Sequence, residues 1–132
     1  MASLALLYFR SRNVAFGFNG TGGWKQQSLN NTSTSDRTLV SGNIGLVALP
    51  NDDRVHAFSA LTGAWSSLVA SGFTASDRID VSGGVAYVYV AAGGHMHAFN
   101  AASGQWTSLQ LPGIGTGSTS PLPVDLAGVS SA

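Results

Sequence analysis

Three histidines come closest, by type and spacing, to a metal site in this chain. His95 and His97 are two residues apart in a segment with strand character, so their imidazoles share one face. A metal would need further ligands, but the chain has no Cys, no Glu accompanies the pair, and His56 lies about one repeat away. We therefore expect hydrogen-bonded strand histidines, with no metal and no cofactor.

Two acid–base pairs, Asp36-Arg37 and Asp77-Arg78, each follow a serine. Such a repeated pair can form a ligand clamp at one rim of the molecule. It can also be a loop residue with a surface ion pair that contributes little to stability. The six acidic residues are all Asp and are spread over expected loops, and no Gly-x-Ser-x-Gly motif is present. No catalytic residue is predicted.

The charge balance argues against two classes of partner. Six Lys and Arg residues balance six acidic residues, and charged residues make up only 9% of the 132, against about 25% in soluble domains. Nucleic acids and anionic membranes select for surplus positive charge, so neither is expected as a partner. A surface of Ser, Thr, Asn, Gln and Gly offers little resistance to self-association.

These candidate residues belong to a chain that repeats itself. The repeat is marked by three glycines, each followed two positions later by a tryptophan: Gly22 and Trp24, Gly63 and Trp65, Gly104 and Trp106. The tryptophans are evenly spaced, and residues 54–69 and 95–110 are identical at half of their positions. A fixed period of this size is typical of propellers and solenoids.

The segments between these landmarks predict β-strands. They are short runs rich in Val, Tyr, Phe and Leu, bounded by Gly, Asn, Asp or Pro, and none keeps apolar residues at helical spacing. The expected class is all-β, with three four-stranded antiparallel units in one domain, 1–132. The unit boundaries are expected at about 1–42, 43–83 and 84–128. The expected strands are 3–9 and 37–42 in the first unit, 44–49, 54–59, 64–69 and 78–82 in the second, and 85–91, 95–100, 105–110 and 123–127 in the third.

A family resemblance follows from the order of residues in each unit. The third unit has Gly93-Gly94, then Phe99-Asn100, then Trp106, and the second keeps Phe58 and Trp65. This order resembles the kelch repeat of β-propeller proteins, and quinoprotein-type propeller repeats are the alternative. The resemblance implies a blade for each unit. It also implies that the repeat tryptophans pack between blades, with Phe58 and Phe99 as structural residues.

Three blades do not close a ring, because propellers have roughly 4–8 blades. Two copies related by a two-fold axis would give six. We therefore expect a homodimer in which the first blade of each chain docks against the third blade of the other. A fragment of a longer propeller is the alternative.

The expected function is that of a non-enzymatic binding or scaffold module, which presents rim loops and a central channel to a protein or a glycan. The second hypothesis is a carbohydrate-binding lectin with pockets between blades. In that case the ligand-binding side chains would be Arg37, Arg78, Trp65 and Trp106. An enzyme is the third hypothesis, and it has no predicted site.

Overall fold

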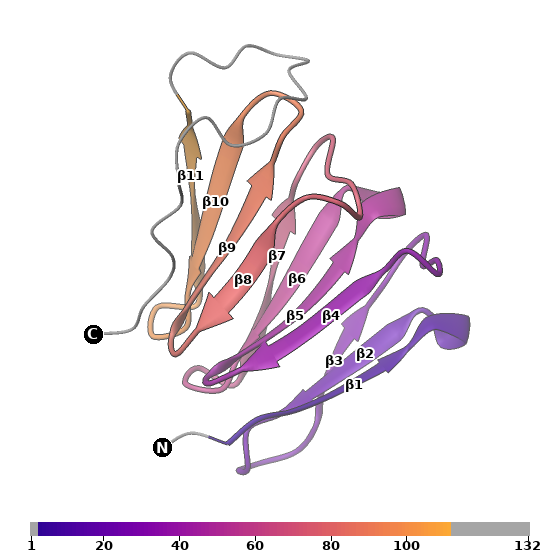
Figure 1. Ribbon diagram of the computed structural model, residues 1–132. Coiled ribbons are helices and arrows are strands. Elements are labelled where there is room, and N and C mark those ends of the chain that lie inside the picture. Colours follow the sequence, from indigo (N-terminus) through magenta and orange to yellow (C-terminus); the bar gives the residue numbers. More distant parts are fainter. Residues whose placement is uncertain (1–2, 112–132) are drawn as a thin grey trace.

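The computed structural model describes residues 3–111, which form three antiparallel sheets stacked face to face (Figure 1). Sheet A contains β1 (Ala5–Phe9), β2 (Val14–Phe18) and β3 (Lys25–Ser28). Sheet B contains β4 (Arg37–Ser41), β5 (Ile44–Leu49), β6 (Arg54–Ser59) and β7 (Ala64–Val69). Sheet C contains β8 (Ile79–Ser82), β9 (Val85–Val90), β10 (His95–Asn100) and β11 (Gln105–Gln110).

The all-β class is confirmed for the described residues. Besides the strands they form only two single-turn 3-10 helices, η1 (Arg10–Arg12) and η2 (Pro50–Asp52). In this part of the chain no helix has the length and apolar character needed to cross a membrane. The sheets have three or four strands each, and their arrangement is blade-like.

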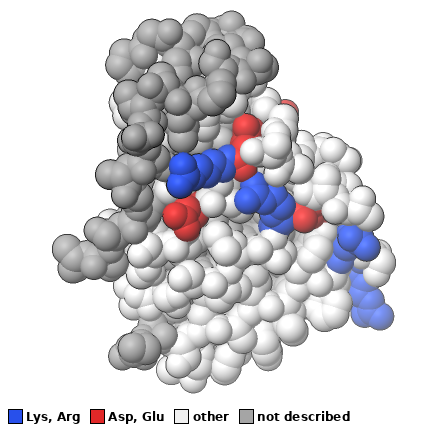
Figure 2. Space-filling model, in the orientation of Figure 1, with Lys and Arg blue, Asp and Glu red and all other residues white. Residues whose placement is uncertain are grey.

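Burial along the strands follows from the stacking. Every residue of β5 is buried because sheet B is covered on both faces. A strand covered on both faces carries apolar residues on both of them. Strand β11 lies at the edge of sheet C, and most of its residues are exposed. Figure 2 shows that charged side chains of both signs lie side by side in one band, while the other described residues on that face are uncharged.

The repeated glycines lie in the turns that join the last two strands of each sheet. Gly63 and Gly104 have φ angles of 69° and 68°, and their N–H groups donate to the carbonyls of Ser59 and Asn100, both at 2.8 Å. Gly22 has the same conformation in sheet A, with φ of 67°. A side chain is strained at such angles, so the turn requires glycine.

The structure groups the strands differently from the expected units. Residues 37–42 were expected to close the first unit, and 78–82 the second, but β4 pairs with β5 and β8 pairs with β9. The reason is a tight turn: Ser41 lies opposite Ile44, with Gly42 at a φ of 56° between them. Two strands joined by a two-residue turn form one hairpin. The expected boundaries are therefore wrong by one strand.

Sheet A is consequently smaller than expected. It has three strands among the described residues, where four were expected. The expected strand at 123–127 lies outside the described residues. The pairing of two chains and the completion of six blades concern a second copy and stay predictions.

Two apolar cores hold the three sheets together. Between sheets B and C the core contains Ile44, Leu46, Val55, Val88, Val90 and Phe99, all fully buried. Between sheets A and B, Val47 and Leu49 are buried with Ala15, and Tyr8 and Trp65 pack against them. Each sheet therefore contacts its neighbour through a continuous apolar layer, the arrangement expected for stacked sheets.

Candidate functional site

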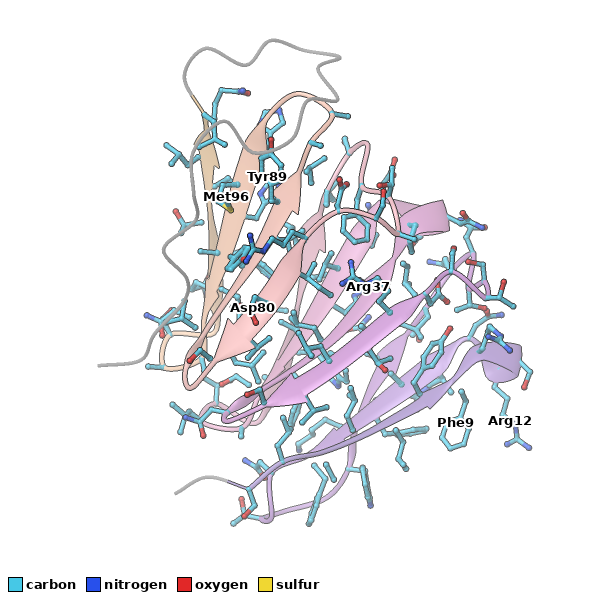
Figure 3. The ribbon with its side chains drawn as sticks, viewed as in Figure 1. Phe9, Arg12, Arg37, Asp80, Tyr89 and Met96 are labelled. Atoms are coloured by element: carbon cyan, nitrogen blue, oxygen red, sulfur yellow. The ribbon has the colours of Figure 1, made fainter. Side chains whose placement is uncertain are left out.

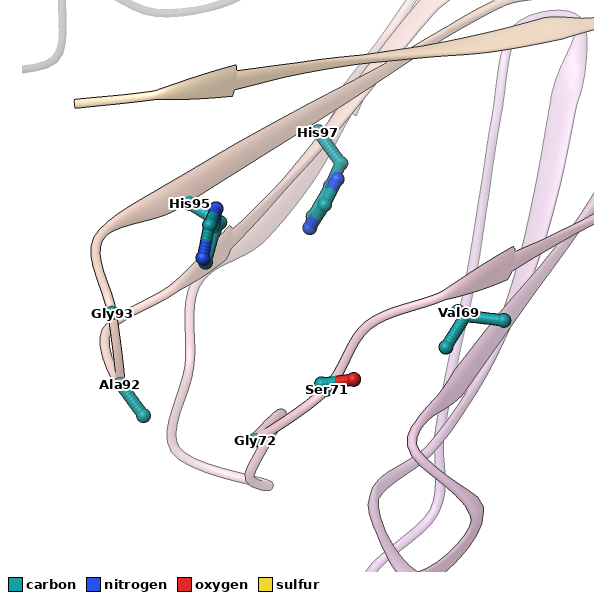
Figure 4. Close-up of a pocket in the computed structure, with 7 residues that line it drawn as sticks. All are labelled: Val69, Ser71, Gly72, Ala92, Gly93, His95 and His97. Atoms are coloured by element: carbon teal, nitrogen blue, oxygen red, sulfur yellow. The ribbon is translucent and has the colours of Figure 1, made fainter. Parts of the chain in front are cut away.

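The junction of sheets B and C opens at one end into a cavity of about 420 Å³. Its walls are the end of β7 with the following loop, and the β9–β10 turn with the start of β10 (Figure 4). The lining residues are Val69, Ser71, Gly72, Ala92, Gly93, His95 and His97. Apolar walls with a few polar groups are typical of pockets for small ligands.

The two histidines provide the polar chemistry of this cavity. Both project from β10 into it, with ring centroids 6.2 Å apart and planes inclined at 20° (Figure 4). The Nδ1 atom of His97 is hydrogen-bonded to Ser108 Oγ at 2.6 Å, which fixes the ring. Gly93 has a φ of 94°, and a Cβ there would lie 3.1 Å from the His95 ring, so glycine leaves space for the imidazole.

Burial keeps the more enclosed histidine neutral. The pKa of His97 is lowered, first by burial and then by the charge of His95. Because Ser108 occupies Nδ1, Nε2 is the atom of His97 left to accept a hydrogen bond or to donate to a ligand. The cavity can therefore bind an uncharged polar group near neutral pH.

The same histidine–serine pair also occurs in sheet B. His56 occupies the position of His97 in sheet B, and its Nδ1 is hydrogen-bonded to Ser67 Oγ at 2.7 Å. It is buried, its Nε2 has no hydrogen-bond partner among residues 3–111, and burial lowers its pKa. The expectation of hydrogen-bonded strand histidines is met at both positions. What distinguishes the third unit is His95, because Arg54 stands at the corresponding position of sheet B.

The described residues bring no third metal ligand to these histidines. Across residues 3–111 there is no group of three or more His, Cys, Asp or Glu side chains that could hold a metal ion. A two-imidazole site would leave half of a tetrahedral coordination shell to water. The chemistry supported by this cavity is therefore hydrogen bonding and apolar contact.

The repeat tryptophans are structural and lie outside this cavity. The indole Nε1 of Trp65 donates to the carbonyl of Lys25 in sheet A at 2.9 Å, and that of Trp106 donates to Ser66 in sheet B at 3.3 Å. Each therefore ties its own sheet to the preceding one. Because the indole N–H is already satisfied by backbone, these two side chains offer only their ring faces to a ligand.

The repeat phenylalanines support the tryptophans. Phe58 and Phe99 are fully buried, with ring centroids 5.4 Å and 5.1 Å from those of Trp65 and Trp106. Trp24 likewise lies 5.1 Å from the ring of Phe18, yet it is 48% exposed. The three units thus share one aromatic pair, and only the first leaves its tryptophan in solvent.

The two aspartates of the Asp-Arg pairs stabilise loops. Asp36 accepts a hydrogen bond from the N–H of Ser33 at 2.8 Å, and Asp77 accepts one from the N–H of Thr74 at the same distance. Asp36 also accepts from the hydroxyl of Tyr8 in sheet A. Burial, and then the bond to Asp36, raises the pKa of Tyr8. Side-chain bonds of this kind hold a turn in place.

The two arginines differ although their sequence context is the same. Arg37 is half-buried, and its guanidinium donates to the carbonyls of Ala75 at 3.3 Å and Asp77 at 2.5 Å, in the loop before sheet C. Arg78 is exposed. None of Arg37, Arg78, Trp65 and Trp106 is among the described residues that line the cavity at His95.

Part of this cavity could be found from sequence and part could not. The shared face of His95 and His97, beside the double glycine, is visible in the repeat. Val69, Ser71 and Gly72 were missed, because the segments that follow the third strand differ between units and carry no common motif. Loops vary in this way while the strands they connect keep their pattern.

Comparison with known proteins gives a likeness of fold alone. The chain matches no protein-family model and no curated protein. Among solved structures it is similar to apo AztD from Citrobacter koseri, with 16% sequence identity and a TM-score of 0.41. That match covers 80% of this chain and 31% of the AztD chain.

Proposed function

We propose that this protein is a non-enzymatic binding or scaffold module, built as half of a kelch-like six-bladed β-propeller and completed by a second copy of the chain. The observation that carries the proposal is the uncovered apolar face of sheet A. In a stack of sheets, each apolar face is buried by the next sheet. The outer face of sheet A has the composition of a buried face but has no neighbour among the described residues.

Four side chains define this outer face. Leu7, Phe9, Phe16 and Trp24 line a shallow hollow of about 290 Å³. Leu7 and Phe9 are 42% and 41% exposed, and Figure 3 shows Phe9 on the side of sheet A away from sheet B. An exposed cluster of large apolar side chains marks an interaction surface.

The same positions are buried one sheet further along. Strands β1 and β2 are joined as β5 and β6 are, by a 3-10 turn that ends on a left-handed residue, Asn13 or Asp53. Phe9 lies four residues before Asn13, and Leu49 lies four residues before Asp53, so the two positions are equivalent. Leu49 is fully buried in the core between sheets A and B. The outer face of sheet A is therefore equivalent to the face by which sheet B packs on sheet A.

Trp24 indicates which surface would cover this face. The other two repeat tryptophans bond carbonyls at equivalent positions of the preceding sheet, Lys25 and Ser66. The next position in that series is Thr107, on β11 of sheet C. The indole N–H of Trp24 would therefore donate a hydrogen bond to the carbonyl of Thr107 of the partner subunit. The surface that covers sheet A would then belong to a second copy of this chain.

In the proposed pairing, sheet A of the partner would lie on the outer side of sheet C, where Tyr87 and Tyr89 are 4% and 3% exposed within one chain. Tyr87 and Tyr89 hold the positions of Leu46 and Ala48, which face sheet C from sheet B. Both hydroxyls are buried without a hydrogen-bond partner in the described part of the chain. Figure 3 shows Tyr89 and Met96 on this sheet. A two-fold axis would place sheet A of each chain on sheet C of the other, which gives six sheets in one ring.

The molecular mass in solution tests the proposal. We expect native mass spectrometry and sedimentation to give twice the chain mass of 13.5 kDa. Phe9→Asp places a charge on the proposed interface and should give a folded monomer. Leu61→Asp is the matched control, because Leu61 is 52% exposed in a turn outside that face. A wild-type protein that stays monomeric at all concentrations would refute the pairing.

The cavity at His95 favours a second candidate function, that of a carbohydrate-binding module. It lies at a junction of two sheets, where a lectin of this architecture would hold its ligand, and it offers imidazole and hydroxyl groups beside apolar wall. A glycan array with wild-type protein and His95→Ala tests this function. If the wild-type protein binds a glycan and His95→Ala does not, the result supports the carbohydrate-binding function. If the wild-type protein binds no glycan, the result favours the scaffold function.

A further inference from the structure

The cavity at His95 has a counterpart between sheets A and B. In each sheet the residue after the last strand donates a backbone hydrogen bond to the carbonyl of the residue just before the second-last strand. These bonds, all at 2.8 Å, join Leu29 to Asn13, Ala70 to Asp53 and Leu111 to Gly94. Counting from these bonds, Asn31 and Asp52 at the first junction correspond to Gly72 and Gly93 at the second.

Polar side chains bridge the counterpart, and glycines leave the cavity open. Between sheets A and B the amide of Asn31 donates to the carboxylate of Asp52 at 3.0 Å, which joins the loop after β3 to the turn before β6. Between sheets B and C both positions are glycine, so no side chain can make this bridge. The loop at Gly72 and the turn at Gly93 instead form two walls of the cavity of about 420 Å³ (Figure 4). Two differences between the repeats therefore open this cavity.

The charges at the junction differ between the repeats as well. The position of His95 is held by Arg54 in sheet B, and the position of Gly93 is held by Asp52. The cavity therefore lacks the permanent cation and the carboxylate of its counterpart, and the described residues that line it include no Asp, Lys or Arg. Its two imidazoles are the lining side chains whose charge changes between pH 5 and 8.

Uncharged side chains flank the two imidazoles within sheet C. Val88 of β9 and Ser108 of β11 lie opposite His97. Val90 and Gln110 hold the same positions beside the other histidine. The strands next to β10 therefore place no charge beside either ring.

Two charged groups lie in the elements that border the cavity. The carboxylate of Asp77, in the loop before β8, accepts hydrogen bonds from the N–H groups of Thr74 at 2.8 Å and Ala91 at 3.4 Å. Arg54 lies opposite Val69, on the face of sheet B that packs on sheet A. Neither is among the residues that line the cavity. When both imidazoles are protonated, the described lining therefore offers them no carboxylate.

We propose that this cavity binds a small organic carboxylate at mildly acidic pH, with one carboxylate oxygen bound by the imidazole of His95 and the other by that of His97. Two imidazolium groups whose ring centroids are 6.2 Å apart repel each other, and an anion between them offsets this repulsion. Each protonated imidazole donates N–H bonds, and a carboxylate has two acceptor oxygens. All of these residues belong to one chain, so the proposal does not depend on the pairing of two chains.

The size of the cavity favours a carboxylate that carries a carbon body. Pockets for small ligands typically measure about 300–1,000 Å³, and they are mostly apolar with a few polar groups that fix the orientation of the ligand. The cavity lies in that range, and Val69 and Ala92 provide apolar wall beside the histidines. An inorganic ion would contact the imidazoles alone, whereas an organic carboxylate would also contact this wall.

The affinity for the carboxylate should rise as the pH falls. Burial, and then the charge of His95, lowers the pKa of His97, so without a bound anion the cavity disfavours protonation of both imidazoles. A nearby anion favours the protonated form, and proton uptake and anion binding therefore strengthen each other. Each proton taken up on binding changes the affinity by up to about tenfold per pH unit.

Benzoate and benzamide test the charge of the ligand, because the two molecules share a shape and differ in charge. Each is titrated into the protein in a chloride-free buffer at pH 5.5 and at pH 8, and the imidazole signals are followed by NMR. We expect benzoate to bind at least tenfold more tightly at pH 5.5 than at pH 8. At pH 5.5 it should also bind at least tenfold more tightly than benzamide.

His56 is an internal control for the site. Its Nδ1 is hydrogen-bonded to Ser67 as the Nδ1 of His97 is to Ser108, but it faces the bridged junction of sheets A and B. Saturating benzoate should raise the midpoint of the His97 titration by about one pH unit, the equivalent of a tenfold change in affinity, and leave that of His56 unchanged. His95→Gln should weaken the binding of benzoate at least tenfold at pH 5.5, whereas the matched variant His56→Gln should bind it as the wild-type protein does.

Four results would each overturn the proposal. Benzoate that binds equally at both pH values, or at neither, would show that the charges of the imidazoles do not hold it. Benzamide that binds as tightly as benzoate would show a site for uncharged groups. An equal displacement of the His56 and His97 titrations would show a general effect of the salt. Wild-type affinity in His95→Gln would place the ligand elsewhere.

Discussion

Gly17→Ala should destabilise the protein by loosening the junction of sheets A and B. A Cβ at Gly17 would lie 2.5–2.7 Å from three ring carbons of Phe58, whereas carbon atoms pack best at about 3.5–4.0 Å. Phe58 is fully buried, so its ring has to move about 1 Å against packed neighbours. Overpacking of this kind costs about 1–3 kcal/mol. Gly17 lies in β2 at a negative φ, so the effect is steric and does not come from backbone strain.

The matched control is Gly23→Ala. Gly23 lies in the same sheet region at a negative φ, and a Cβ there would meet nothing within 4 Å. We expect that substitution to be neutral, or to stabilise the fold by a few tenths of a kcal/mol through the unfolded chain. Urea unfolding at equal protein concentration measures both, because any association shifts the apparent stability.

A double variant identifies the contact. Phe58→Leu shortens the side chain that Gly17 contacts, so Gly17→Ala should cost less in that background than in the wild-type protein. A favourable coupling of about 1 kcal/mol would assign the clash to these two residues. If Gly17→Ala unfolds at the same urea concentration as Gly23→Ala, the packing of sheet A on Phe58 described above is incorrect.

Three further predictions concern the junctions. Trp65→Ala should destabilise the fold by about 3 kcal/mol in urea, while Trp24→Ala should leave the unfolding of the monomer nearly unchanged and weaken only the pairing. Arg37→Ala removes two bonds to backbone carbonyls across the junction of sheets B and C, and should cost about 1–2 kcal/mol in the same assay. The pKa values of His56 and His97 are lowered by burial, so the unfolded chain binds more protons than the folded one below about pH 6.5. The melting temperature should therefore fall from pH 7 to pH 5, and less steeply in His56→Gln and His97→Gln, whereas a profile that these substitutions do not flatten would contradict the assignment.

Most strands could be predicted from the sequence, because each is bounded by a turn that its residues require. Residues 44–49, 54–59 and 64–69 were predicted with the bounds that the structure has. The segments are short, rich in β-branched and aromatic residues, and end at Gly, Asn or Asp, so local chemistry decides them. The repeat also led us to expect Phe58 and Phe99 as structural residues, and in the structure both are fully buried.

The grouping of strands into sheets could not be predicted from the period. The length of a sequence repeat does not show at which residue each sheet begins. Arg37–Ser41 could therefore be assigned to sheet B only if the hairpin at Gly42 was recognised as a turn inside one sheet. The role of Arg37 was missed for a related reason. Its acceptors are backbone carbonyls of the following unit, and no residue type marks a carbonyl.

The offset between sequence unit and sheet affects how such a protein can grow by duplication. Because β4 and β8 each pair with the strand that follows them, one 41-residue period of the described sequence takes strands from two neighbouring sheets. Copying one period therefore reproduces a junction between sheets together with strands on both of its sides. A change at a junction residue such as Gly17 then acts on the angle between neighbouring sheets and leaves the strands themselves unchanged.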